Sequence, residues 1–304
     1  MSGPSASKMS GTLARVLTAA VLIPIVVAVV LWGPAWLVAI AVGLVTVLAL
    51  LEFLALGEKI GMHGFRIWTS FCGVGLVYCA WIQTEQQLSG SAARSGQLST
   101  PFNFLNGFDF RNPEDITVGG VFLLFAFGTA AIVIFGRRPL KDALHGVGIG
   151  SAALLLIGLP LSFLVHLLEG GERLLLFLLV LVWVGDTAAY FVGRKLGKHL
   201  LAPQLSPKKT WEGVAANLAG SLVVAYLFAR WLSIPWELMI IAGLLGSVVG
   251  QISDLLESAF KRSAGVKDSG SLLPGHGGVL DRIDALILAA PVVWYYFARW
   301  MPIR

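Results

Sequence analysis

The sequence has little charge. Asp, Glu, Lys and Arg make up 13% of its 304 residues, against roughly 25% in soluble globular domains. Four long segments contain none of these residues: 16–51, 116–136, 143–168 and 238–253. Because about 20 apolar residues cross a bilayer core, this composition excludes a soluble enzyme or a disordered chain. The apolar residues form continuous runs rather than alternating, which also excludes a β-barrel. The predicted fold class is all-α, a polytopic helical membrane protein.

Cysteine is also scarce. The two cysteines, Cys72 and Cys79, lie seven residues apart in one apolar segment, which suits neither a zinc site nor a disulfide that staples a domain. We expect both to be packing residues. The sequence has no internal repeat, and this disfavours a transporter built from inverted repeats.

The apolar runs predict about nine transmembrane helices. A long segment rich in Ser, Gly, Gln and Asn, at about 85–115, has turn-forming composition and is predicted to be a flexible external loop. The nine candidate spans are 16–32, 35–56, 67–84, 116–136, 143–168, 173–193, 212–232, 236–256 and 279–300.

The positions of Lys and Arg predict the orientation. With the N-terminus in the cytoplasm, 16 of the 22 Lys and Arg residues fall on the cytoplasmic side, as the positive-inside rule requires. An odd number of spans leaves the C-terminus outside. The net charge of +5 is spread over many short loops, so it indicates membrane topology and no nucleic-acid partner.

Charge is concentrated near the C-terminus, where residues 254–284 hold nine charged side chains and five glycines. Asp254 and Glu257 share a helix face at the end of one span, and Asp281 and Asp284 do so at the start of the next. If the connection folds back, the two carboxylate pairs face each other at the membrane boundary, where unpaired carboxylates are costly. Mg²⁺ would neutralise them, since it favours carboxylate and phosphate oxygens. The simpler interpretation is a solvated loop whose charges pair with one another.

Two further segments carry polar residues on the same predicted membrane side. The segment SPKKTWEG, at 206–213, has the composition of an anion site at a helix N-terminus. Asp186 interrupts an apolar span, and an intramembrane carboxylate indicates a functional site by default. The alternative for Asp186 is a hydrogen-bonded residue at a frayed helix end, with Thr187 and Tyr190 as partners.

These residues resemble a known family. The segments SAFKR (258–262), KDSG (267–270) and PGHGGVLDRID (274–284) closely resemble the signature of the phosphatidate cytidylyltransferases, or CDP-diacylglycerol synthases. The segments SPKKTWEG and GDTAAYFVGRKLGK, the latter at 185–198, are similar to family features in the expected order. The resemblance is strong over about 180–290, and Ser253 departs from it where the family more often has glycine.

The resemblance implies a bacterial inner-membrane enzyme, a homodimer, with CTP and phosphatidate as substrates and CDP-diacylglycerol and pyrophosphate as products of a step in phospholipid biosynthesis. It divides the chain into N-terminal transmembrane helices, 1–170, and a C-terminal catalytic transmembrane region, 171–304. The expected cofactor is Mg²⁺, and the presence of a second, monovalent cation stays open. The family's metal-binding aspartates fall on Asp254 and Asp281. We expect Glu257 and Asp284 to orient these ligands without binding the metal themselves.

The remaining candidate residues divide into two groups. Basic side chains suit a pyrophosphate leaving group, and glycines let the backbone approach phosphate closely. The expected catalytic residues are Lys261, Arg262, His276 and Arg282. The expected substrate- and phosphate-binding residues are Asp186, Ser206, Lys208, Lys209, Thr210, Lys267, Asp268, Gly277 and Gly278.

Two other functions stay open at this stage. A related membrane enzyme could use CTP as a kinase that phosphorylates a lipid alcohol. A transporter, from a different class, could use Asp186 and Asp254 as ion ligands, although clustering of the charges at one membrane face rather than at mid-membrane argues against it.

Overall fold

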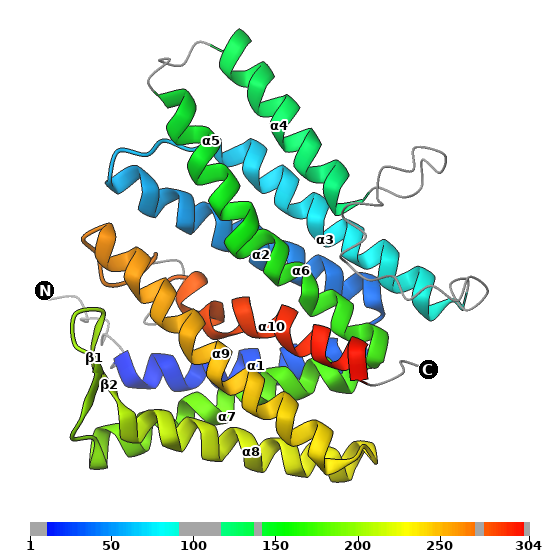
Figure 1. Cartoon of the computed structure of the whole chain (residues 1–304), viewed down its shortest axis with the longest axis vertical. Helices are drawn as coiled ribbons and strands as arrows, with labels where there is room; N and C mark the ends of the chain where they lie inside the picture. The colour runs from blue at the N-terminus through cyan, green and yellow to red at the C-terminus, as the bar shows by residue number, and fades with distance from the viewer. Residues whose placement is uncertain (1–10, 91–116, 137–141, 271–276, 301–304) are drawn as a thin grey trace, which may run out of the picture.

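The described residues form a bundle of helices with a small hairpin (Figure 1). The computed structural model describes residues 11–90, 117–136, 142–270 and 277–300. Its helices are α1 (Gly11–Trp32), α2 (Ala35–Lys59), α3 (Arg66–Leu88), α4 (Val118–Phe135), α5 (Asp142–Ala153), α6 (Leu159–His166), α7 (Glu172–Leu196), α8 (Trp211–Leu232), α9 (Trp236–Ser263) and α10 (Leu280–Trp300). A π-helical turn, η2 (Leu154–Gly158), joins α5 to α6, a 3₁₀ turn, η3 (Leu167–Gly170), follows α6, and the strands are β1 (Leu200–Ala202) and β2 (Ser206–Thr210).

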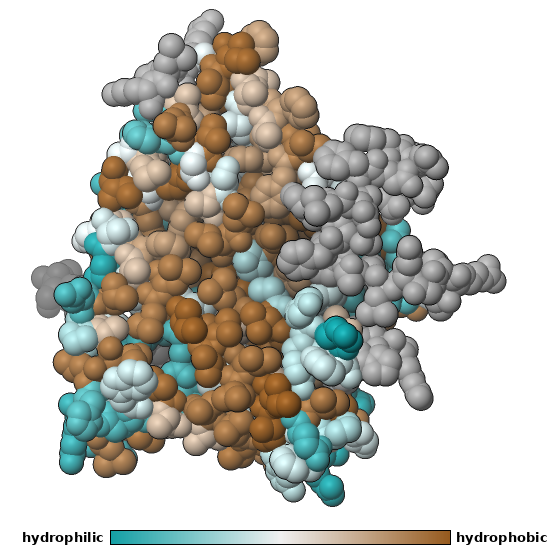
Figure 2. Space-filling model, in the orientation of Figure 1, coloured by the Kyte–Doolittle hydropathy of each residue, from teal (hydrophilic) through white to brown (hydrophobic). Residues whose placement is uncertain are grey.

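The predicted membrane class is confirmed. Among the described residues, six helical segments are long and apolar enough to cross a membrane: α2, α4, the continuous run from α5 to η3, α7, α8 and α9. Figure 2 shows the matching surface, a broad hydrophobic face with hydrophilic residues gathered toward its margins. The other predicted spans, at α1, α3 and α10, are helical, but their described residues do not meet both the length and the apolar composition needed to cross a membrane. The total of nine spans therefore stays a prediction, as does the external loop, most of which lies outside the described residues.

Close packing of α7 to α10 depends on small residues. At Gly243 a Cβ atom would lie 2.7 Å from the Cβ of Ala225 on α8, and at Gly250 it would lie 3.3 Å from the carbonyl oxygen of Ala285 on α10. Small residues let helix backbones approach closely in membranes, where apolar burial between helices contributes little. The approach of α9 to α10 at Gly250 places the charged end of α9 beside the start of α10.

The functional segments meet at one end of the bundle. The C-terminal ends of α2, α7 and α9 lie at the same end as the hairpin, on the left of Figure 1. The α10 helix begins there and runs back toward the opposite end. This arrangement is the one that the predicted orientation requires for a site on a single membrane face.

The segment before α8 forms a β-hairpin, where the sequence predicted a loop. β1 and β2 pair antiparallel, with Leu200 opposite Thr210 and Ala202 opposite Ser206. Thr210 then caps α8, since its hydroxyl accepts a 3.2 Å hydrogen bond from the backbone N–H of Gly213. Such a cap satisfies one of the unpaired N–H groups at a helix start. β2 therefore leads directly into α8, and its two lysines, at 208 and 209, are fixed just before the helix.

Candidate active site

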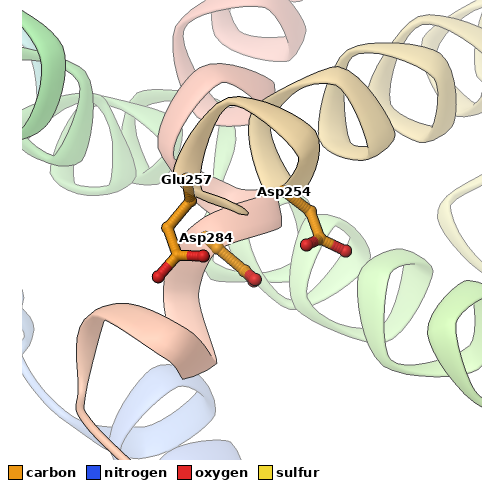
Figure 3. Close-up of side chains that lie close together, drawn as sticks. All are labelled: Asp254, Glu257 and Asp284. Atoms are coloured by element: carbon orange, nitrogen blue, oxygen red, sulfur yellow. The ribbon is translucent and has the colours of Figure 1, made fainter. Parts of the chain in front are cut away.

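Three carboxylates converge where α9 meets α10. Asp254, Glu257 and Asp284 each offer an oxygen, and these atoms lie within 4.8 Å of one another (Figure 3). Asp254 and Glu257 come from one face of α9, as the i,i+3 spacing predicted, and Asp284 comes from α10. Glu257 is buried, and its Oε1 atom accepts no hydrogen bond from the described residues. Clustered carboxylates repel one another and lose hydration when buried, so this geometry fits a divalent cation.

Asp281 lies beyond this cluster and is held by other groups. Lys261 Nζ lies 2.5 Å from Glu257 Oε2 and 2.6 Å from Asp281 Oδ1, so one ammonium group bridges the cluster to Asp281. The other oxygen, Asp281 Oδ2, accepts hydrogen bonds from the backbone N–H groups of Ser269 and Gly278, at 3.0 and 2.8 Å. The structure thus gathers Asp284 with the α9 carboxylates and ties Asp281 to Lys261. The metal roles predicted for residues 254 and 281 stay predictions.

A cavity of about 800 Å³ opens beside Asp254, between α7, α8 and the hairpin. Lys209 reaches into it and pairs with Asp254, with 2.6 Å between Nζ and Oδ2. Asp186 also lines the cavity and accepts a 3.2 Å hydrogen bond from Asn217 Nδ2. The other polar side chains of the lining are those of Tyr190, Arg194, Lys208, Thr210, Asn217 and Gln251. The cavity therefore combines cations with carboxylates, the combination that a metal-bound polyphosphate needs.

Asp186 is not at a frayed helix end. The α7 helix continues to Leu196, and Asp186 bonds to Asn217 of α8. The hydroxyl of Thr187 instead donates to the carbonyl of Trp183, and the hydroxyl of Tyr190 accepts a hydrogen bond from an arginine of the same helix. The alternative of an Asp186 bonded to Thr187 and Tyr190 at a frayed helix end is therefore wrong. Asp186 bonds to Asn217 and lines the cavity.

Two of the predicted residues belong to the surroundings of the cavity rather than to its lining. Arg262 donates to the carbonyls of Leu205 and Val266, so it ties the hairpin to the end of α9. Ser206 pairs within the hairpin and does not line the cavity. Both therefore hold the hairpin in place, and their predicted contacts with substrate stay predictions.

The other predicted residues lie in or next to the connection between α9 and α10, residues 264–279, called here the signature loop. Lys267 and Asp268 in this loop and Arg282 on α10 are exposed. Gly277 has a φ of 78°, which favours glycine over other residues. His276, predicted to be catalytic, lies outside the described residues. The roles predicted for these side chains stay predictions.

Ser253, the departure from the family pattern, joins α9 to α10. Its buried hydroxyl donates to the carbonyl oxygen of Asp284 and accepts a 3.3 Å hydrogen bond from the N–H of Leu288. A glycine would make neither bond. Serine at this position therefore fixes the backbone that carries Asp284.

Sequence reasoning missed two polar residues of the site. Asn217, buried on α8, accepts from Ser247 at 2.7 Å while its amide group donates to Asp186. Glu52, buried on α2, accepts three hydrogen bonds from the 269–280 region. The available signal was the same for both: each is a polar group inside a long apolar run, which indicates a specific partner in a membrane protein.

Comparison with known proteins identifies the family of the chain. The model of the "Cytidylyltransferase family" matches residues 13–300. Proteins named phosphatidate cytidylyltransferase are similar to large parts of the chain. The one from Brucella suis biovar 1 is 38% identical over 79% of this chain and 86% of its own length. Those from Bacillus subtilis (strain 168) and Haemophilus influenzae are 40% and 46% identical over 50% and 42% of this chain, and these matches span 58% and 46% of their own lengths.

The fold and the site together define a polytopic membrane protein with a cluster of carboxylates and lysines at one end of its bundle. The match over nearly the whole chain is more specific. The chain belongs to the cytidylyltransferase family.

Proposed function

We propose that the protein transfers the cytidylyl group of CTP to phosphatidate, giving CDP-diacylglycerol and pyrophosphate for phospholipid biosynthesis. The observation that carries this proposal is the contact between the carboxylate cluster and the basic cavity, made by Lys209 and Asp254 at 2.6 Å. The negative charges of a nucleoside triphosphate are neutralised by basic side chains and by a metal ion. Here the basic side chains lie next to the carboxylates that would bind the metal ion. The names of the relatives support the choice of substrates.

We propose that Mg²⁺ is the cofactor and that Asp254, Glu257 and Asp284 would hold it. Hard oxygen ligands suit this ion, and the cluster supplies three. Asp281, the ligand implied by the family resemblance, is separated from this cluster by the ammonium group of Lys261, which contacts both Asp281 and Glu257. When bound, the ion would neutralise phosphate charge and orient the triphosphate. The second, monovalent cation stays a prediction.

The protein's own residues would position the reactants. Lys208 and Lys209, fixed by the hairpin and the capped start of α8, would hold the β- and γ-phosphates and stabilise the charge that develops on the leaving group. A phosphatidate oxygen attacks the α-phosphorus, a new P–O bond forms, and the bond to the β-phosphate oxygen breaks. The lipid phosphate is already anionic near neutral pH, so no side chain need act as a strong base. The helices flanking the cavity expose apolar residues such as Tyr190 and Trp211, which suits a substrate that stays in the bilayer.

The setting of the enzyme is part of the same proposal. The relatives are bacterial, and we propose a location in the bacterial inner membrane with the N-terminus and the active site in the cytoplasm. The predicted homodimer also belongs to this proposal. The positive charges near the hairpin and α9 support this orientation.

The test is product stoichiometry with purified protein. With CTP, phosphatidate and Mg²⁺, CDP-diacylglycerol and pyrophosphate should appear in equal amounts, and neither should form without phosphatidate. At the same Mg²⁺ concentration, Asp254→Asn should form much less of both products. Glu58→Gln, on the surface of α2, serves as the active control. Pyrophosphate release that does not depend on phosphatidate would contradict the proposal.

A further inference from the structure

Glu52 is a buried carboxylate that joins the N-terminal helices to the site. It lies near the end of α2, is only 7% exposed, and is the first charged residue after the uncharged run 16–51. No cation is paired with it among the described residues. Its two oxygens instead accept hydrogen bonds from Ser269 Oγ at 2.8 Å and from the N–H groups of Val279 and Leu280 at 2.9 Å.

These contacts cap α10 from another helix. The first N–H groups of a helix have no acceptor within it, and the helix dipole makes that end partly positive. α10 begins at Leu280, so Glu52 supplies both the missing acceptor and the compensating negative charge. This stabilisation explains how a carboxylate can be buried in an apolar helix without a cation.

Ser269 extends the connection to the catalytic residues. Its hydroxyl lies 2.8 Å from Glu52 Oε2 and 3.0 Å from Asp281 Oδ2, and Asp281 in turn contacts Lys261. The path therefore runs from Glu52 through Ser269 and Asp281 to the ammonium group that touches the carboxylate cluster. Every contact along it is 3.0 Å or shorter.

Two glycines leave the space that Glu52 occupies. At Gly270 a Cβ atom would lie 2.6 Å from Glu52 Oε1, and at Gly278 it would overlap Glu52 Oε2. Side chains at these positions would push the carboxylate away. The described residues on either side of 271–276 thus leave room for the Glu52 carboxylate.

We propose that Glu52 is a positioning residue for the transfer reaction, which sets the start of α10 and, through Ser269, the place of Asp281 and Lys261. The inference rests on the proposed function for its kinetic part only. Glutamine at this position has the same shape, but one of the two carboxylate oxygens is replaced by an NH₂ group. In one orientation this group faces Ser269 Oγ and the N–H of Leu280, and in the other it faces the N–H of Val279. Because those groups are themselves donors, the amide cannot reproduce the set of bonds.

The experiment compares Glu52→Gln with Glu169→Gln in full-length protein. Glu169 is a matched control, since it is buried to a similar degree and bonds to His166 and Trp294 toward the other end of α10. Glu52→Gln should lower kcat by about tenfold or more. It should also raise the Mg²⁺ concentration for half-maximal rate, because Lys261, at the end of the path, contacts the proposed ligand Glu257. Hydrogen exchange measured by mass spectrometry should rise about tenfold at residues 279 and 280, the size expected when one hydrogen bond is lost. Glu169→Gln should change none of these.

Ser269→Ala is a second, milder variant that keeps the cap on α10. It should lower kcat by about two- to tenfold, and the double variant should lose less than the product of the two single effects, because both changes interrupt one path. If Glu52→Gln protein does not fold, the kcat of Ser269→Ala decides, and a wild-type value overturns the proposal.

The remaining outcomes separate the two proposals. Normal kcat and Mg²⁺ dependence in Glu52→Gln would overturn the positioning role, even if hydrogen exchange rises. If the wild-type protein itself makes no CDP-diacylglycerol, the proposed function fails, while unchanged exchange in Glu52→Gln would independently overturn the structural part of the inference.

Discussion

Lys261 on α9 and Asp281 on α10 form a buried ion pair, with 2.6 Å between Nζ and Oδ1. The same ammonium group contacts Glu257 Oε2 at 2.5 Å. One lysine thus holds two acidic side chains together, and it connects the carboxylate cluster to the signature loop.

Removal of this lysine should be costly to stability as well as to activity. Lys261→Met leaves Glu257 and Asp281, whose side chains are 3% and 8% exposed, without their shared cation. Breaking a buried ion pair by removing one partner destabilises a protein by about 3–5 kcal/mol. Thermal unfolding in detergent measures the loss.

The exposed pair of Arg66 and Glu58 provides the control, since its side chains are 44% and 32% exposed. Glu58→Gln should cost at most about 1 kcal/mol, as surface ion pairs generally do. Equal losses for the two variants would show that the Lys261 pair is not buried in the working protein.

The carboxylate cluster predicts a ranking of Mg²⁺ dependence. Asp254→Asn and Asp284→Asn each remove one charge from the group of three without changing its shape. Both should raise the Mg²⁺ concentration for half-maximal rate by about 10-fold or more. Asp281→Asn should lower kcat chiefly through Lys261 and the signature loop. A Mg²⁺ shift in Asp281→Asn as large as in Asp254→Asn, with none in Asp284→Asn, would instead favour the ligand pair that the family resemblance implies.

The two hairpin lysines should differ in effect. Lys209 pairs with Asp254, whereas Lys208 is exposed at the edge of the cavity. Lys209→Met should therefore reduce kcat/KM for CTP more than Lys208→Met does, and steady-state kinetics at fixed Mg²⁺ would show it. The reverse order would mean that the ion pair between Lys209 and Asp254 has no part in binding CTP.

The predicted topology determines where single cysteines react. The buried Cys72 and Cys79 are first replaced by alanine. Lys198→Cys and Lys267→Cys should then be blocked only by reagent on the cytoplasmic side, whereas Ser233→Cys, between α8 and α9, should react from outside. Labelling of positions 198 and 267 from opposite sides would rule out a single site.

Much of this architecture could be predicted from the sequence because it depends on local pattern. Uncharged runs fix the helices, and the i,i+3 spacing of Asp254 and Glu257 places both on one face. The return of α10 beside α9 then brings Asp284 to them, whereas Asp281, expected to face them as well, lies outside the cluster and pairs with Lys261. These features need only helix periodicity and one connection that folds back.

The rest depends on contacts between segments distant in sequence. Glu52 and Val279 are 227 positions apart, and nothing in α2 alone specifies that bond. The hairpin was missed because SPKKTWEG is too short and too polar to show the alternation typical of strands. Asn217 was missed for the same reason as Glu52, since its partner Asp186 lies on another helix.

The fate of each phosphorus atom of CTP distinguishes cytidylyl transfer from phosphorylation. Purified protein is given phosphatidate, Mg²⁺ and CTP labelled at either the α- or the γ-phosphorus. A cytidylyltransferase moves the α label into the lipid phase and leaves the γ label in water as pyrophosphate, and this is the predicted result. Label entering lipid from the γ position, with none from α, would contradict it and identify a CTP-dependent lipid kinase.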